Sequence, residues 1–385
     1  MRIGIDVRYL SHGLVGGVHT YIAHFVPALI DLAVDHEIVL YADTKRPFEL
    51  HNLPKHVTVR LLPYRNALSS VQHDMFMRRQ MAQDRLDVVH FPANYGFGPP
   101  GARTVITLHD VINILPLHEI LRGHGKNPRT IAMMTYLHVL TTQAVRRADA
   151  LLTVSAHAAG QIARQSGRDP RQIIAVPHAP TPDLRRIVDA AQLEAVRQRH
   201  GLQRQFVLAD ALKNPAVLVR AWRRLPAELR ARYEIVFFAR RPDLLPIVSE
   251  AVAEGAARLL VRPAREDLIA LYSMAEAFVF PSWIEGFGIP ILEAMTCGTP
   301  VIASDRGSIP EVAGGAVLLA DAEDDAAFAR HLAQVLGDPA VAQRLREQGF
   351  ARAAQFSWPR TARQILELYE QIVRNLPATA VPESV

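Results

Sequence analysis

Cysteine is almost absent from this sequence, since Cys297 is the single one in 385 residues. An internal disulfide is therefore impossible, and a metal site built from cysteines is not supported. We expect Cys297 to be a small buried residue rather than a nucleophile. The scarcity of cysteine fits a reducing compartment, and we expect a cytoplasmic protein.

Three other patterns are missing. No stretch approaches the ~18 uncharged apolar residues that a membrane-spanning helix needs, so we expect at most peripheral contact with the inner face of the cytoplasmic membrane. No basic run is typical of a nucleic-acid-binding arm, and no nucleic-acid partner is expected. No Gly-x-Gly-x-x-Gly follows the first apolar segment, which argues against a nicotinamide-dependent dehydrogenase.

The composition is that of a globular protein. Apolar residues make up 49% of the chain and charged residues 21%, which is enough to form sizeable cores and excludes disorder as the dominant state. The length of 385 residues suits two domains of about 150 to 200 residues each. The net charge of +5 is compatible with anionic ligands and requires none.

Short apolar, β-branched runs alternate with longer amphipathic segments, which predicts an α/β fold with parallel sheets covered on both faces. Two such series occur, and each predicts a doubly wound, Rossmann-like domain. The strand candidates are 2–8, 37–42, 57–62, 87–91, 104–108, 150–154 and 173–176, followed by 206–209, 234–239, 258–261, 277–281, 300–303 and 316–319.

A proline-rich interruption around residues 177–183 separates the two series, because neither a helix nor a central strand tolerates it. We predict an N-terminal domain over 1–178, a linker region over 179–200 and a second domain over 201–358. A C-terminal helix within 359–385 is expected to pack back towards the first domain and to end in a frayed tail. Because ligands of doubly wound sheets bind outside the carboxyl ends of the strands, we expect the site in an interdomain cleft.

The most informative segment follows the strand candidate 277–281 and leads into a helix that has Pro290 near its first turn. Gly286 and Gly288 allow the backbone to approach a ligand closely, and the exposed N–H groups at a helix start favour a phosphate-like anion. Glu285 precedes this helix, and Glu293 lies inside it. Carboxylates on either side of a phosphate site are suited to accept hydrogen bonds from sugar hydroxyls.

This segment resembles the E-x7-E motif of glycosyltransferase family 4, the retaining nucleotide-sugar enzymes with two facing Rossmann-like domains called GT-B. The resemblance extends through residues 304–312. It implies that Glu293 holds the ribose hydroxyls and Glu285 the hydroxyls of the transferred sugar. It further implies that the phosphates and the sugar are bound by the backbone amides of Gly286, Phe287, Gly288 and Ile289.

Parts of the first half are similar to the same family. Gly16 and Gly17 open the helical segment 18–33 and are similar to the family's first glycine loop, which approaches the donor phosphate and the acceptor. His109, at the end of an apolar strand, resembles the family's cleft histidine, which contacts the transferred sugar. Ser155 matches a family pattern too, and as a helix cap it would have a purely structural reason to be there.

The loop after strand 206–209 departs from the family. Lys213 matches the basic residue that neutralises the leaving diphosphate, but the arginine usually found ahead of it is missing, and Asp210 stands close to its place. By topology the nearest substitutes are Arg240, Arg241, Arg262 and Arg265. Among them we favour Arg262, because its loop resembles the family's nucleotide-base pocket.

Together, these features predict a retaining hexosyltransferase that uses a nucleoside-diphosphate sugar, GDP-mannose or a UDP-sugar. The expected acceptor is a hydroxyl of a glycan or lipid-linked saccharide in surface polysaccharide synthesis, and the frequency of mannose transfer in the resembled family favours mannose as the sugar. No metal is expected, because no Asp-x-Asp motif is placed in the predicted cleft. Two alternatives stay open: a degenerate GT-B protein that binds a sugar nucleotide or a partner without efficient transfer, and a GT-B epimerase or hydrolase.

Overall fold

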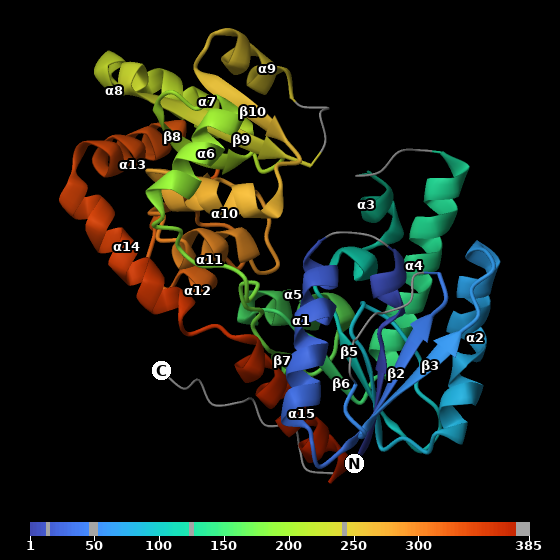
Figure 1. Cartoon of the computed structure of the whole chain (residues 1–385). Coiled ribbons are helices and arrows are strands. Elements are labelled where there is room, and N and C mark those ends of the chain that lie inside the picture. Colours follow the sequence, from blue (N-terminus) through green and yellow to red (C-terminus); the bar gives the residue numbers. More distant parts are fainter. Residues whose placement is uncertain (13–15, 46–52, 123–126, 241–244, 375–385) are drawn as a thin grey trace. The chain divides into compact units, whose positions relative to one another are not determined.

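The computed structural model describes residues 1–12, 16–45, 53–122, 127–240 and 245–374 (Figure 1). The chain divides into two units. The first unit combines residues 1–178 with residues 357–385, and the second unit is the continuous stretch 179–356. Each unit is described by itself.

The first unit is built on a parallel sheet of seven strands, in the order β3-β2-β1-β4-β5-β6-β7. Strands β4 and β6 are buried along their whole length, as expected for apolar strands that helices cover on both faces. The strands are β1 (Arg2–Asp6), β2 (Glu37–Asp43), β3 (Val57–Leu62), β4 (Val88–Phe91), β5 (Arg103–Thr107), β6 (Ala150–Thr153) and β7 (Ile173–Ala175). The helices are η1 (Arg8–His12), α1 (Gly17–Leu32), α2 (Ala67–Gln83), η2 (Ile112–Ile114), α3 (Leu117–Arg122), α4 (Pro128–Arg147), α5 (Ala156–Ser166), η3 (Pro170–Gln172) and α15 (Trp358–Val373).

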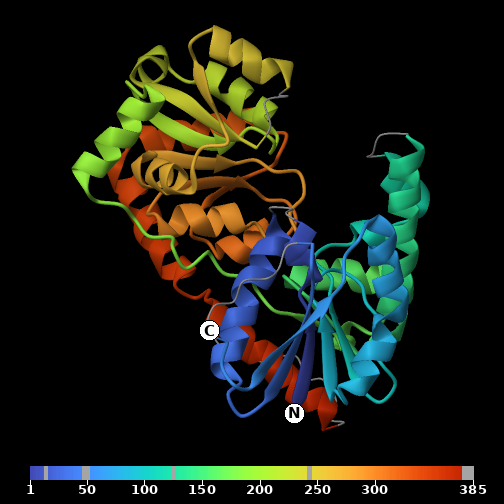
Figure 2. The ribbon, with the colours of Figure 1, turned by 45° about the vertical axis from the view of Figure 1, so that its right-hand side comes forward.

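Helix α15 lies beside α1, although the two are far apart in the sequence (Figure 2). Its apolar stripe includes Ile365, Leu368 and Tyr369, which are buried. The hydroxyl group of Tyr369 lies 2.6 Å from Nδ1 of His90 on β4, and both side chains are buried. The C-terminal helix therefore completes the core of the first unit.

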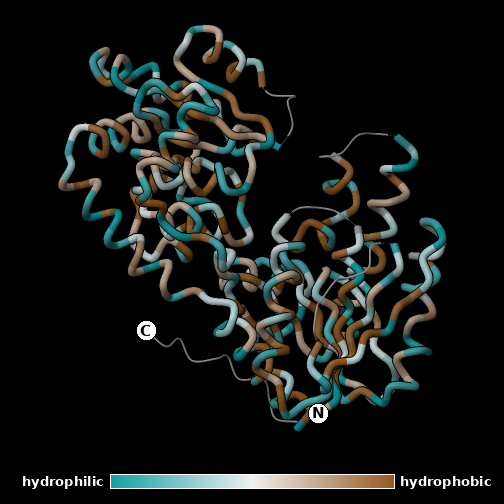
Figure 3. Tube along the Cα trace, in the orientation of Figure 1, coloured by the Kyte–Doolittle hydropathy of each residue, from teal (hydrophilic) through white to brown (hydrophobic). Residues whose placement is uncertain are grey.

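The second unit is built on a parallel sheet of six strands, in the order β10-β9-β8-β11-β12-β13. The strands are β8 (Gln205–Asp210), β9 (Tyr233–Ala239), β10 (Ala257–Val261), β11 (Ala277–Phe280), β12 (Val301–Ser304) and β13 (Leu318–Ala320). The helices are α6 (Ala190–His200), α7 (Pro215–Arg224), α8 (Ala227–Arg232), α9 (Pro246–Ala253), α10 (Arg265–Met274), α11 (Ile289–Thr296), α12 (Ile309–Ala313), α13 (Asp325–Gly337) and α14 (Pro339–Ala353). In Figure 3 the strands of each unit are mainly brown, whereas many outer helix turns are teal.

The strand order reverses once in each sheet, between β1 and β4 in the first unit and between β8 and β11 in the second. In doubly wound sheets the loops that leave the two strands at this point diverge, and a ligand crevice forms outside their carboxyl ends. The segments that follow these four strands are therefore the places where each unit is expected to bind ligands.

The predicted α/β class with parallel sheets is confirmed, and the strand bounds differ by a few residues. The predicted strand 277–281 ends at Phe280, because Pro281 lacks the N–H that would extend the ladder. The segment 179–200, predicted as a linker region, includes helix α6 and lies in the second unit. The predicted tail 375–385 lies outside the described residues.

Candidate functional site

An ion pair joins the two strands at the switch point of the second unit. Lys213 follows β8, Glu285 follows β11, and Lys213 Nζ lies 2.7 Å from Glu285 Oε1. The side chain of Glu285 is 13% exposed and that of Lys213 is 36% exposed. Asn214 fixes the turn beyond Lys213, because its side-chain amide donates to the carbonyl groups of Pro281 and Ala322. The predicted cation and the first predicted carboxylate are thus brought together.

Glu285 is held on its side chain and on its backbone. Ser282 Oγ donates to Glu285 Oε1 over 2.8 Å, and Ser308 donates to the Glu285 carbonyl group from both Oγ and N. Gly307, at φ +62°, packs against this backbone so closely that a Cβ would lie 2.5 Å from the Glu285 carbonyl oxygen. These contacts fix the loop between β11 and α11 and orient its carboxylate.

Helix α11 begins directly after this loop. Gly288 is its N-cap at φ +95°, a conformation that an L-residue adopts only with strain. Ile289 is the first residue of the helix, and its backbone N–H has no partner within the helix and favours an anion. Pro290 carries no N–H, and the Ile291 N–H donates to the Gly288 carbonyl group over 3.0 Å. The ring of Phe287 is buried against Phe356, with centroids 5.9 Å apart, so its contribution to a ligand site would come from the backbone. Gly286 lies between Glu285 and this buried ring.

Glu293, the second predicted carboxylate, lies on α11 with its side chain 13% exposed. Arg265 Nη1 lies 3.1 Å from Glu293 Oε1, and the Tyr272 hydroxyl group donates to Oε2 over 3.4 Å. Arg265 also contacts Asp183 and Thr181. Burial lowers the pKa of Arg265, but the carboxylates of Glu293 and Asp183 outweigh it, so the pKa is raised and the guanidinium stays charged.

The charges around Lys213 include a further carboxylate and a further cation. Asp210 ends β8 and accepts a hydrogen bond from the Leu212 amide. Burial raises the pKa of Asp210, whereas the Leu212 amide and the positive charges of Lys213 and Arg240 act in the opposite direction. Arg262, at φ +51°, donates from Nε to the Arg240 carbonyl group over 3.0 Å and so lies beside the end of β9. Arg241 lies outside the described residues.

In the first unit, His109 follows β5 and is buried. Its Nε2 lies 2.9 Å from the Pro92 carbonyl oxygen. Because a carbonyl oxygen only accepts, Nε2 carries the proton in neutral His109, and Nδ1 is then an acceptor. Burial lowers the pKa of His109 to about 4, so the ring is neutral at pH 7. Its ring packs edge-on against Tyr21 of α1, with centroids 5.2 Å apart.

The other predicted residues of the first unit have different surroundings. Gly16 is the N-cap of α1 and Gly17 its first residue, and a Cβ on either would meet no atom within 4 Å. The protein itself therefore does not explain why glycine stands at these two positions. Ser155 caps α5 by accepting from the Ala158 amide, which gives it a structural role.

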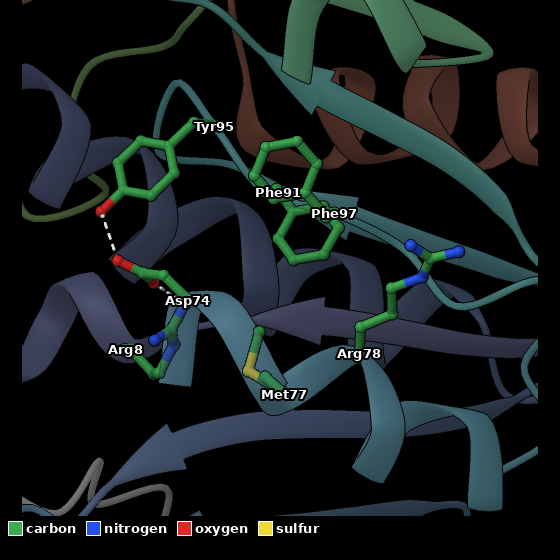
Figure 4. Close-up of a pocket in the computed structure, with 8 residues that line it drawn as sticks. Arg8, Asp74, Met77, Arg78, Phe91, Tyr95 and Phe97 are labelled. Atoms are coloured by element: carbon green, nitrogen blue, oxygen red, sulfur yellow. Dashed lines mark hydrogen bonds and ion pairs between the residues drawn. The ribbon is translucent and has the colours of Figure 1, made fainter. Parts of the chain in front are cut away.

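A small pocket lies at the switch point of the first sheet (Figure 4). Asp74 on α2 accepts from Arg8 Nη2 over 2.9 Å, from the Tyr95 hydroxyl group over 3.1 Å and from the Tyr136 hydroxyl group over 2.7 Å. Arg8 is also paired with Asp6 at the end of β1. The ion pairs of Arg8 with Asp6 and Asp74 thus fasten α2 to the carboxyl end of β1. None of the predicted site residues lines it.

Three further observations concern the reactivity of Cys297, metal binding and membrane-spanning helices. Cys297 is buried, and burial raises the pKa of its thiol to about 12, so it is not a thiolate nucleophile at neutral pH. Within the described residues, no group of three His, Cys, Asp or Glu side chains could hold a metal ion. No helix in the described parts of the chain is long and apolar enough to cross a membrane.

Sequence reasoning missed the residues that position the predicted ones, and it considered Arg265 only for a different role, as a diphosphate cation. Ser282, Ser308 and Gly307 hold Glu285, and Arg265 with Tyr272 holds Glu293. The serines and Gly307 lie in or just after the motif segment, which is a usable signal. Nothing in the spacing of Arg265 or Tyr272 indicates that they face Glu293.

The chain is similar to known proteins in both units. A family model described as glycosyl transferases group 1 matches residues 208–352, and one described as Glycosyltransferase Family 4 matches residues 15–184. O-antigen chain mannosyltransferase B of Escherichia coli is 33% identical over 296 residues, 75% of this chain and 75% of that protein. Serotype-specific mannosyltransferase WbdA of Escherichia coli is 29% identical over 289 residues, which are 72% of this chain and 34% of that longer protein.

A solved structure has the same fold. Sucrose-phosphate synthase from Thermosynechococcus elongatus matches with a TM-score of 0.72 at 20% identity, and the match covers 97% of this chain and 99% of that chain.

Proposed function

Since this chain belongs to glycosyltransferase family 4 and is a retaining glycosyltransferase with a GT-B fold, we propose that it transfers a hexose from a nucleoside-diphosphate sugar. The proposed hexose is mannose. The proposed acceptor is a hydroxyl group of a glycan or lipid-linked saccharide in the synthesis of a surface polysaccharide. Mannose is supported by the printed names of two relatives, both mannosyltransferases.

The observation that carries the proposal is the pair of Lys213 and Glu285 at the switch point, directly before the N-terminus of α11. A diphosphate needs a cation and backbone donors, and a sugar needs acceptors for its hydroxyl groups. Lys213 and the first turn of α11 supply the former, and Glu285 supplies the latter. We assign Lys213 to the leaving diphosphate and Glu285 to the transferred sugar.

The remaining residues of the second unit extend this assignment. Backbone N–H groups from Gly286 to Ile289 would bind the phosphates and the sugar, because the positive φ of Gly288 turns the chain into the helix there. Glu293 would accept from the ribose hydroxyl groups. Arg262, next to the end of β9, is assigned to the nucleotide base.

In the first unit, His109 would accept a hydrogen bond from the transferred sugar at Nδ1, because its Nε2–H is engaged with the Pro92 carbonyl group. The neutral ring makes this acceptor available at pH 7. Gly16 and Gly17 would leave room for the donor phosphate and the acceptor, since the space where a Cβ would stand is open at both. We propose that transfer needs no metal ion.

The experiment compares donor consumption with and without an acceptor. The full chain is screened for thermal stabilisation by GDP, UDP, ADP and TDP sugars. The stabilising donor is then incubated with lipid-linked and free mannosides, and the products are identified by mass. A transferase consumes donor faster when the acceptor is present. Consumption that does not depend on an acceptor would indicate a hydrolase or epimerase instead, and stabilisation without turnover would indicate a binding protein.

A further inference from the structure

One guanidinium group links Glu293 to a distant segment of the chain. Arg265 is the first residue of α10, and each of its three nitrogen atoms has a different acceptor. Nη1 lies 3.1 Å from Glu293 Oε1, Nε lies 3.2 Å from Asp183 Oδ2, and Nη2 donates to Thr181 Oγ1. The acceptors come from α11 and from residues 181–183 at the start of the second unit.

This arrangement fixes the direction of the Glu293 carboxylate. A guanidinium group is planar and presents its donors in a rigid fork, so binding Asp183 and Thr181 sets the position from which Nη1 reaches Glu293. The hydroxyl group of Tyr272, which is buried, donates to the other carboxylate oxygen. Glu293 is thereby held from both oxygens.

The same contacts leave capacity for a ligand. Each carboxylate oxygen has two lone-pair sites, and each oxygen of Glu293 accepts one hydrogen bond from Arg265 or Tyr272. A diol could therefore donate to Glu293 without displacing the groups that orient it. A carboxylate held in this way loses little freedom when a ligand binds, which strengthens its preference for a correctly placed hydroxyl group.

We propose that Arg265 is a positioning residue for ribose recognition, which aims the Glu293 carboxylate at the ribose hydroxyl groups by anchoring it to Asp183 and Thr181. This inference rests on the proposed role of Glu293. It also gives Arg265 a role different from neutralising the diphosphate, because its contacts with Glu293, Asp183 and Thr181 hold the guanidinium group beside Glu293 and pair its charge with two carboxylates.

The experiment measures how strongly the full chain distinguishes ribose from deoxyribose. Dissociation constants are determined by calorimetry for GDP, 2′-deoxy-GDP and 3′-deoxy-GDP, and for UDP with its two deoxy analogues. The nucleotide that binds more tightly is used for the variants. In the unmodified protein, at least one deoxy analogue is expected to bind about 10-fold or more weakly, the effect of losing a hydrogen bond to a charged group.

The variants are Glu293→Gln, Arg265→Gln and Asp183→Asn. We expect each to shrink the ribose-to-deoxyribose ratio, with Asp183→Asn having the smallest effect because Arg265 keeps its contact with Thr181. Arg220→Gln is the matched control, since Arg220 on α7 pairs with Asp325 and not with Glu293. This control is expected to keep the ratio of the unmodified protein.

The outcomes separate this inference from the proposed function. If Glu293→Gln shrinks the ratio and Arg265→Gln does not, the inference is overturned and the role of Glu293 stands. If Arg265→Gln weakens the binding of GDP and of its deoxy analogues by the same factor, the role of Arg265 is structural only, which overturns the inference too. If Glu293→Gln keeps the full ratio, the assignment of Glu293 to ribose fails together with the inference.

A second variant covers the possibility that Arg265→Gln does not fold. Arg265→Lys keeps the positive charge but cannot reach three acceptors with one planar group. We expect it to lose part of the ribose-to-deoxyribose ratio while binding the diphosphate. A ratio equal to that of the unmodified protein would show that charge alone suffices and would overturn the positioning role.

Discussion

Lys213 and Glu285 form a 2.7 Å ion pair across the switch point of the second sheet, although 72 positions separate them in the sequence. The pair unites the one side chain assigned to the leaving diphosphate with the one assigned to the transferred sugar. A change in either residue should therefore affect both parts of the donor.

Replacing Lys213 by Ala is expected to lower kcat by about 100-fold or more, because one positioned cation at a developing negative charge contributes roughly 3 kcal/mol to transition-state stabilisation. The matched control is Lys55→Ala, since Lys55 is exposed in the first unit and lies in neither site. Steady-state transfer rates with the identified donor test this. An activity equal to that of the control would remove Lys213 from the mechanism.

Replacing Gly307 by Ala is expected to destabilise the second unit by about 1–2 kcal/mol or more, since Gly307 has φ +62° and an added Cβ would collide with the Glu285 backbone. Transfer should fall as well, because the collision displaces Glu285. Urea unfolding and activity measure the two effects. Gly160→Ala serves as the control: Gly160 lies inside α5 at ordinary backbone angles, and there alanine should stabilise by about 0.5–1 kcal/mol.

Stability is expected to fall as the pH drops from about 6.5 towards 4, in part through His109. Burial lowers the pKa of His109 from its ordinary value of 6.5 to about 4, so within this window the unfolded chain binds a proton that the folded protein does not. His109→Asn should therefore show a shallower decrease in unfolding free energy between pH 7.5 and 4.5, measured by urea unfolding.

The control for this experiment is His118→Asn, because His118 is exposed. It should reproduce the slope of the unmodified protein. Buried His90 and His178 act in the same direction as His109, so a residual slope is expected in the His109 variant. Identical slopes in all three proteins would contradict the burial of a neutral His109.

Replacing Tyr369 by Phe is expected to lower the unfolding free energy of the first unit by about 1–3 kcal/mol, because it leaves Nδ1 of buried His90 without its 2.6 Å contact. Glu367→Gln on the exposed side of α15 is the matched control and should stay within about 0.5 kcal/mol. Thermal unfolding of both variants tests whether α15 is fastened to the sheet through this contact.

The sequence allowed the fold class and most elements to be predicted, because buried parallel strands are continuous apolar runs and the helices are amphipathic. The start of α11 was predictable for a local reason, since Gly288 and Pro290 determine it within three residues. Contacts that depend on strand order were not predictable. That Lys213 meets Glu285 follows only from β8 lying next to β11, which no periodicity encodes.

The contact between Arg265 and Glu293 could not be predicted from the sequence either. It depends on α10 and α11 lying side by side and on residues 181–183 returning to the same point. The predicted topology makes Arg265 a candidate for the diphosphate cation, alongside Arg240, Arg241 and Arg262. The structure instead gives each nitrogen atom of Arg265 an acceptor within the protein.

Because the chain returns to the first unit after residue 356, only the second unit is encoded by one continuous stretch of the gene. Residues 179–356 are an insertion: a single uninterrupted segment, bounded at both ends by the other unit. Its host is discontinuous, and a stop codon after residue 356 would deprive that host of α15 and its buried Tyr369 while leaving every residue of the insert encoded. Truncation from the C-terminus should therefore destabilise the first unit before it removes any residue of the second, although most of the first unit is translated earlier.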